Sequence, residues 1–152
     1  MSAQSPVKKT EAIGLSDEEF LRQFETCTLR YVHWTHRAHL RVAYLYVTHF
    51  GLDGAIPKVT AGIRAYNQSQ NIVDTPTSGY HETMTVAWLH IVAAALAACG
   101  PVGGAEQFLE MQPQFQKDFL LRFYSPQCLG SPEAKYSFVM PDLATLPSAP
   151  HS

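Results

Sequence analysis

The feature that most constrains the fold of this chain is a segment that is apolar on nearly all sides. It runs from Met84 to Cys99, about 16 residues, and only Thr85 and His90 interrupt it. A helix that is hydrophobic all round is normally buried, and this one is shorter than the roughly 20 residues that a bilayer span requires. The sequence therefore predicts a buried helix over about 80–98 at the centre of a globular domain.

Capping residues and apolar spacing predict further helices on both sides of this segment. No alternating strand pattern is present, so we expect an all-α fold, a single compact helical bundle of about five to six helices. In the first half of the chain we expect a capping box from Ser16 to Glu19, an N-cap at Thr35 and a helix end at Phe50 before Gly51. Asp53 is the expected N-cap of the next helix, whose inner face is Val59, Ile63 and Tyr66, and a loop follows over 67–79. After the apolar helix ends at Gly100-Pro101, we expect a helical region over about 104–124, broken near Pro113, and a short helix from Ser131-Pro132.

The length of the chain limits its domain organisation. A chain of 152 residues can form one hydrophobic core and is too short for two ordinary domains. We expect one helical domain over residues 16–147, with a flexible N-terminal tail over 1–15 and a flexible C-terminal tail over 148–152.

Composition excludes several classes of partner. The net charge is −2 and the 11 basic residues are dispersed, so no nucleic acid is expected. No apolar segment follows the lysines near the N-terminus, so no signal peptide is expected. The apolar run over 84–99 is too short for a bilayer span, so no membrane partner is expected. Three cysteines far apart in the sequence form no disulfide framework, which favours the cytoplasm.

A homo-oligomer is expected if an aromatic segment leaves an exposed apolar strip, formed by Phe115, Phe119, Phe123 and Tyr124.

Two histidines occupy one face at the start of the helix over 36–50. At 100° per residue, His36 and His39 project with Leu40, Ala43, Val47 and Phe50 toward the expected core, opposite Arg37, Arg41, Tyr44 and Thr48. Side chains at i and i+3 have Cβ atoms about 5–6 Å apart. This separation suits two imidazoles that bind one metal ion, with metal–nitrogen bonds of about 2.0–2.1 Å.

A histidine and a glutamate open the apolar helix. We expect His81 and Glu82 in its first turn, where the helix dipole favours a carboxylate and disfavours a cationic imidazole, so a neutral His81 is expected. The sequence echoes the first half of the zinc-protease motif HExxH. Thr85 stands in place of the second histidine, so a metallopeptidase is not supported.

The leading hypothesis is a small metal-dependent enzyme that acts on a small organic molecule. If the two helix starts meet, His36, His39 and His81 would hold a divalent ion, zinc or iron, and Glu82 would act as general base or additional ligand. Zinc would lower the pKa of a bound water toward about 7, and iron would suit oxygen chemistry. Substrate-binding roles are expected for Trp34, Tyr80 and Thr85.

Two alternatives remain open at this point. The first is a metal-free helical ligand-binding or assembly protein, in which the histidines are hydrogen-bonding core residues. The second is metal-free acid–base catalysis by His81 and Glu82. His49 and His90 lie away from both helix starts and are interpreted as structural, and Cys99 is interpreted as a core residue.

Several strings together resemble a family of small, mostly uncharacterised bacterial proteins, over about residues 17–147. The resemblance implies a single all-helical unit. It implies no activity and assigns no functional residues. The strings that carry it are Trp34-Thr35-His36-Arg37-Ala38-His39-Leu40, Tyr80-His81-Glu82-Thr83, Ser131-Pro132-Glu133-Ala134, Pro141-Asp142-Leu143 and Leu146-Pro147.

Overall fold

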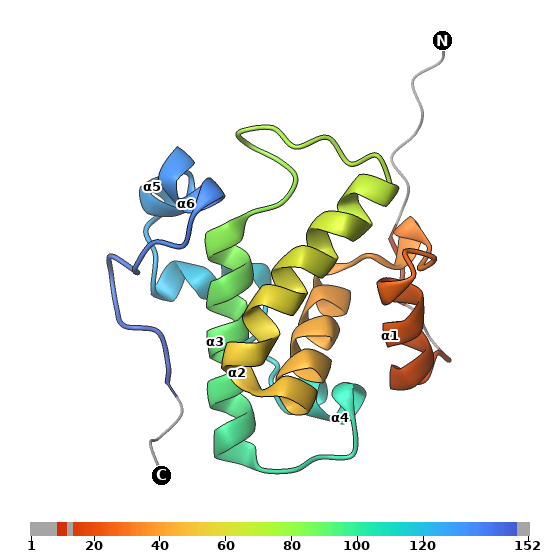
Figure 1. Ribbon diagram of the computed structural model, residues 1–152. Coiled ribbons are helices and arrows are strands. Elements are labelled where there is room, and N and C mark those ends of the chain that lie inside the picture. The colour runs from red at the N-terminus through yellow and green to blue at the C-terminus, as the bar shows by residue number, and fades with distance from the viewer. Residues whose placement is uncertain (1–8, 12–13, 149–152) are drawn as a thin grey trace.

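The computed structural model describes residues 9–11 and 14–148, and the regular elements in this part are all helices, which confirms the predicted all-α class (Figure 1). The remaining parts of the two predicted tails, residues 1–8, 12–13 and 149–152, lie outside the described residues. The elements are α1 (Asp17–Glu25), η1 (Tyr31–His33), α2 (His36–Ser69), α3 (Glu82–Cys99), α4 (Ala105–Glu110), η2 (Lys117–Arg122), α5 (Pro126–Leu129) and α6 (Pro132–Tyr136), where η denotes a short 3-10 helix.

The chain reverses its direction inside α2, at Gly51. This glycine has φ 71° and ψ 172°, a conformation that is essentially restricted to glycine. It divides α2 into a first arm, residues 36–50, and a second arm, residues 52–69, which run in opposite directions (Figure 1). The predicted helix end at Gly51 is confirmed. Asp53 is not an N-cap, because the second arm already includes it, and this arm extends beyond Asn67 to Ser69.

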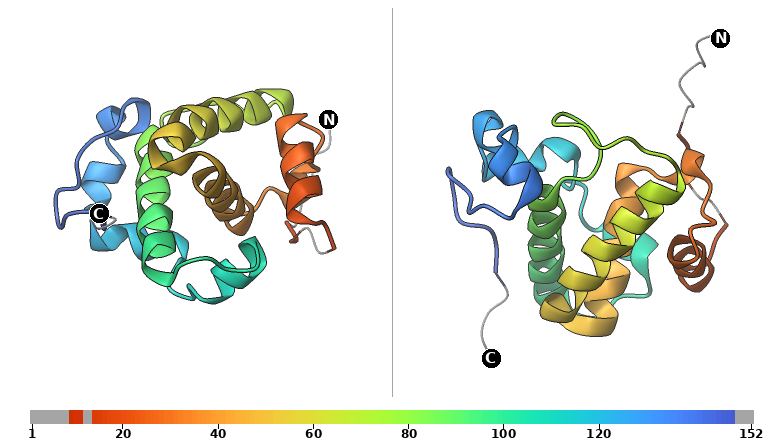
Figure 2. Two further views of the ribbon diagram at one scale, coloured as in Figure 1. Left: turned by 60° about the horizontal axis from the view of Figure 1, so that its bottom comes forward. Right: turned by 45° about the horizontal axis from the view of Figure 1, so that its top comes forward.

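The first arm of α2 is the most enclosed element of the fold. Figure 2, left, shows it surrounded by the second arm, α3, α4 and α1. We predicted that the helix over 80–98 takes the central place, but α3 is buried only in its first part: its buried side chains all lie between Thr83 and Val92. By length and composition alone α3 could cross a membrane, a property that it shares with core helices of globular proteins.

The face of the first arm that we predicted to be polar is covered by α1 and α4. Tyr44 is only 5% exposed and packs on Phe108 of α4, with ring centroids 4.9 Å apart. Arg41 donates from Nε to Asp17 of α1 at 2.9 Å. Phe50, predicted to face inward, is 50% exposed, because the chain turns away from the core at the next residue.

Most of the predicted N-cap residues cap a helix in the structure. Thr35 accepts a hydrogen bond from the Ala38 N–H at 3.0 Å, and Ser16 and Ser131 cap α1 and α6 in the same way. Glu19 does not complete the capping box, since its carboxylate pairs with Arg22 instead. The predicted helical region over 104–124 is interrupted between α4 and η2, around Pro113.

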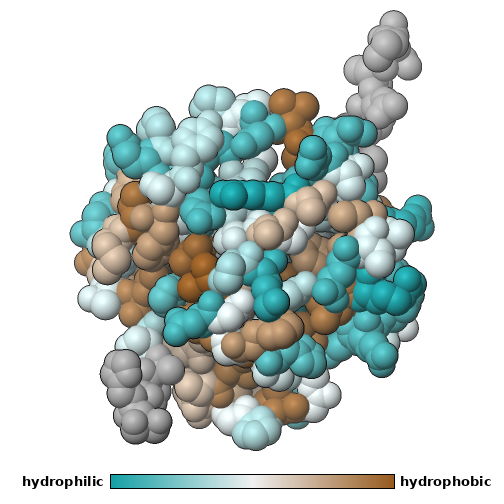
Figure 3. Space-filling model, viewed as in Figure 1, coloured by the Kyte–Doolittle hydropathy of each residue, from teal (hydrophilic) through white to brown (hydrophobic). Residues whose placement is uncertain are grey.

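The aromatic segment that suggested an oligomer surface belongs to the core. Phe115 and Tyr124 are buried, and Phe119 and Phe123 are half-buried. The Tyr124 hydroxyl donates to the Val139 carbonyl at 2.8 Å, so this segment also attaches the C-terminal stretch. On the face drawn in Figure 3, hydrophilic and apolar residues are interspersed.

The reversal at Gly51 gives a first testable prediction. Gly51→Ala should lower the free energy of unfolding by about 1–3 kcal/mol, because a Cβ strains this backbone conformation. Steric overlap is not the cause, since among residues 9–11 and 14–148 no neighbouring atom lies within 4 Å of that Cβ position. Urea denaturation measures the change. Asp53→Ala, at an exposed helical position two residues later, is the control and should change stability by less than about 0.5 kcal/mol. Equal effects of the two variants would contradict the assigned role of Gly51.

Candidate functional site

A single cavity of about 600 Å³ lies between the two histidine-bearing helix starts. It is bounded by the start of the first arm of α2, the end of the second arm, the start of α3, and η2. Six of the seven predicted site residues line it, namely His36, His39, His81, Trp34, Tyr80 and Thr85, whereas Glu82 does not. The other lining residues are Lys9, Thr35, Leu40, Ala43, Val59, Ile63, Asn67, Gly79, Met84, Trp88, Leu89, Lys117 and Leu120.

Aromatic rings fix the two histidines of the first arm. The Trp34 ring lies on the His39 ring, with centroids 3.8 Å apart, and its other neighbours include Tyr66 at 4.7 Å. The Trp88 ring packs edge-on against His36 at 5.2 Å. The rotamers of both imidazoles are therefore restricted by packing, as in a preformed site.

Hydrogen bonds define which ring nitrogen of each of these histidines carries the proton. His39 Nδ1 lies 2.6 Å from the Thr35 carbonyl, and His36 Nε2 lies 3.0 Å from the Phe115 carbonyl. A carbonyl only accepts, so each of these nitrogens is the donor. Burial lowers the pKa of His36. Burial also lowers the pKa of His39 to about 4, with smaller contributions from repulsion by a protonated His36 and by the lysine charges. Both rings are thus neutral at pH 7.

His81 is the N-cap of α3 and lies outside its first turn, where we had placed it. Its Nδ1 accepts the Met84 N–H at 3.1 Å, and its Nε2 donates to the Leu129 carbonyl at 2.8 Å. Burial and the nearby Lys135 charge lower its pKa, which agrees with the neutral His81 that we expected. Both ring nitrogens are engaged, so His81 connects α3 to the end of α5.

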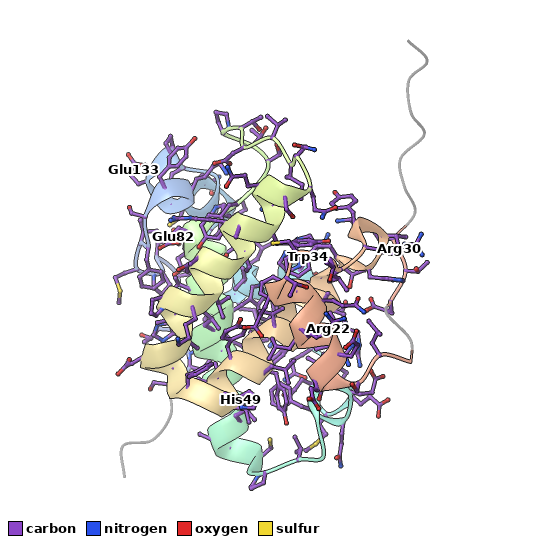
Figure 4. All side chains as sticks on the ribbon, turned by 45° about the vertical axis from the view of Figure 1, so that its right-hand side comes forward. Arg22, Arg30, Trp34, His49, Glu82 and Glu133 are labelled. Atoms are coloured by element: carbon purple, nitrogen blue, oxygen red, sulfur yellow. The ribbon has the colours of Figure 1, made fainter. Side chains whose placement is uncertain are left out.

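Glu82 is directed away from the cavity. Its carboxylate accepts the Tyr80 hydroxyl at 2.5 Å and lies 3.5 Å from the Arg64 guanidinium. Figure 4 shows Glu82 and Trp34 on opposite sides of the second arm of α2. Burial and the Glu82 carboxylate raise the pKa of Tyr80 well above its ordinary value. Glu82 therefore orients Tyr80, a wall residue of the cavity.

Lys135 is a functional candidate that the sequence reasoning missed. The residue is only 3% exposed, and its Nζ donates to Asp74 Oδ1 at 2.7 Å, to the Ser78 carbonyl at 3.0 Å and to the Tyr80 carbonyl. It thereby attaches the segment over 74–80 to α6. A lysine in a short helix carries no sequence signal for such a role, because its partners lie more than 50 residues away in the sequence.

Asn67 is a second functional candidate, for which the sequence suggested a place near a pocket but favoured a solvated surface role. Its Oδ1 is buried and accepts no hydrogen bond from the described residues, and the residue lines the cavity. A buried acceptor without a donor costs about 1–3 kcal/mol. We had assigned Asn67 to a loop, because asparagine is common there, whereas it lies in the last turn of α2.

The predicted metal site was compared with the donor atoms of the structure. Within residues 9–11 and 14–148, no three His, Cys, Asp or Glu side chains form a group that could hold a metal ion. His81 has no free ring nitrogen and Glu82 is not a lining residue. These donors do not fit the three-histidine site, and metal binding stays a prediction.

The neutral state of His39 predicts how stability depends on pH. The unfolded chain has a histidine pKa of about 6.5, so between this pH and about 4 it binds more protons at this position than the folded chain. The free energy of unfolding should therefore fall as the pH falls, by about 3 kcal/mol from this residue. Urea denaturation at pH 7.5, 6.0 and 5.0 should show this slope, reduced in His39→Gln. An unchanged slope in His39→Gln, or a reduction also in exposed His49→Gln, would contradict it.

The contacts of Lys135 give a further prediction. Lys135→Met keeps the length of the side chain and removes all three hydrogen bonds, so it should lower the free energy of unfolding by about 2 kcal/mol and release the segment over 74–80. Limited proteolysis should then cleave within this segment. Lys58→Met, at an exposed position of α2, is the control. Resistance of Lys135→Met equal to that of the unsubstituted chain would refute the attachment.

Comparisons of the chain with known protein families, with curated proteins and with solved structures found no match. The resemblance to small bacterial helical proteins thus stays a prediction, and the functional argument rests on the cavity.

Proposed function

We propose that this chain binds a small organic molecule with a flat apolar body in the cavity between the arms of α2 and the start of α3. The observation that carries the proposal is that the cavity, about 600 Å³ in volume, joins aromatic walls to a few polar groups held by packing. Ligand sites in proteins have volumes of about 300–1,000 Å³ and this same combination of surfaces.

The state of the histidines supports binding over acid–base catalysis. With a pKa of about 4, His39 is a weak base, far from the operating range of a general base near pH 7. His81 uses both ring nitrogens within the fold. Glu82 is paired with Tyr80 and Arg64. The proposal therefore follows the metal-free binding protein that the sequence left as an alternative.

The metal-dependent enzyme is the second candidate. The observation that favours it is that His36 and His39 line the same cavity, each with one ring nitrogen free of protein hydrogen bonds in the described part of the chain. Elemental analysis of untagged protein tests it. Near-stoichiometric zinc or iron that is lost in His36→Ala would support it, and no metal after reconstitution would reject it.

The proposal includes a cytoplasmic location. All three cysteines are free thiols in the structure, which supports a reducing compartment. The aromatic segment that motivated the prediction of a homo-oligomer is packed into the core. A homo-oligomer therefore stays a hypothesis from the sequence alone.

Both tryptophans of the chain line the cavity, so their fluorescence reports its occupancy. We expect saturable quenching by 2-naphthol, a flat two-ring probe. Ala43→Leu fills the cavity and should weaken this binding at least tenfold. Ala95→Leu, on α3 outside the cavity lining, is the matched control and should bind normally. Absence of saturable quenching, or equal weakening in both variants, would overturn the proposal.

A further inference from the structure

Three acceptor atoms of the cavity lining form no hydrogen bond with the described residues. Because His39 Nδ1 and His36 Nε2 are donors to backbone carbonyls, the lone pairs of these neutral rings lie on His39 Nε2 and His36 Nδ1. Neither atom is hydrogen-bonded to the described residues. Asn67 Oδ1 is a third acceptor in the same cavity, buried and without a donor in the part of the chain that the structure describes.

The hydroxyl donors on the cavity wall are already used by the protein. Thr85 donates to the His81 carbonyl at 2.8 Å, Thr35 donates to Glu11 at 3.2 Å, and Tyr80 donates to Glu82. His81 offers no free atom, as described above. The hydroxyl and imidazole groups of the wall therefore present unpaired acceptors and no unpaired donor.

Charge narrows the class of ligand further. Lys9 and Lys117, both exposed, also belong to the cavity lining, and their charges disfavour a cationic ligand at this place. A carboxylate would place its oxygens against the lone pairs of two imidazoles and an amide. An uncharged ligand with an O–H or N–H group avoids repulsion by the lysines and can donate a hydrogen bond to these lone pairs.

We propose that the ligand is a neutral, flat aromatic or heteroaromatic molecule that donates a hydrogen bond, such as a phenol or an N–H heterocycle, to the acceptors His36 Nδ1, His39 Nε2 and Asn67 Oδ1. This proposal rests on the proposed function. The rings of Trp34, Trp88 and Tyr80 provide the surfaces for the flat body. The ligand then donates to the amide oxygen of Asn67, to which none of the described residues donates.

Three probes of one shape test the proposal by calorimetry at pH 7: 2-naphthol, its methyl ether 2-methoxynaphthalene, and 2-naphthoate. We expect 2-naphthol to bind about tenfold more tightly than each of the others, since the loss of one buried hydrogen bond corresponds to about that factor. In Asn67→Leu the preference of 2-naphthol over its methyl ether should fall to about threefold or less. Lys58→Gln, at an exposed position of α2 outside the cavity lining, should leave this preference unchanged.

The outcomes separate the two proposals. Equal binding of 2-naphthol and its methyl ether would overturn the donor assignment and leave the binding function intact. If 2-naphthoate binds most tightly and this binding is lost in Lys117→Gln, the donor assignment is wrong and the cavity is an anion site. If no probe binds, both proposals fail.

A second measurement does not depend on a variant that folds. In ¹⁵N-histidine spectra at pH 7, one ring nitrogen of His36 and one of His39 should show the chemical shift of an unprotonated acceptor and move upfield when 2-naphthol is added. Full protonation of either ring, or no movement at saturation, would overturn the proposal.

Discussion

The architecture depends on one backbone constraint, the reversal at Gly51. Without it, α2 would be one helix of 34 residues, about 50 Å long, with no surface turned toward itself. With it, the first arm becomes the enclosed element, and Trp34 and His36 at its start come close to Asn67 at the end of the second arm, around one cavity. A single residue without a Cβ thus creates both the core and the site.

Much of the fold could be predicted because its determinants are local. Thr35, Ser131 and Gly51 act within a few residues of their own positions, so their roles as helix caps and as a helix end could be predicted from the sequence. The identity of the central helix could not be predicted, because Tyr44 and Arg41 have the pattern of a polar face. In the structure α1 and α4 cover this face. Burial of such a face depends on segments that lie more than 20 residues away.

The candidate site was predictable in its membership and not in its chemistry. Spacing placed His36 and His39 on one face of a helix, and in the structure both line one cavity together with His81. What each group can do is decided by distant backbone carbonyls, those of Phe115 for His36 and Leu129 for His81. Such carbonyls give no signal in the sequence, and neither does the lack of a donor to Asn67 Oδ1 among the described residues.

The attachment by Lys135 has a consequence for the kinetics of the cavity. Its Nζ joins α6 to the carbonyl of Tyr80, so the wall at Tyr80 and the C-terminal helix form one cooperative unit of local unfolding. An opening of the cavity that displaces the backbone at Tyr80 would have to break the hydrogen bond from Lys135. The residence time of a ligand would then be set by a segment that never touches it.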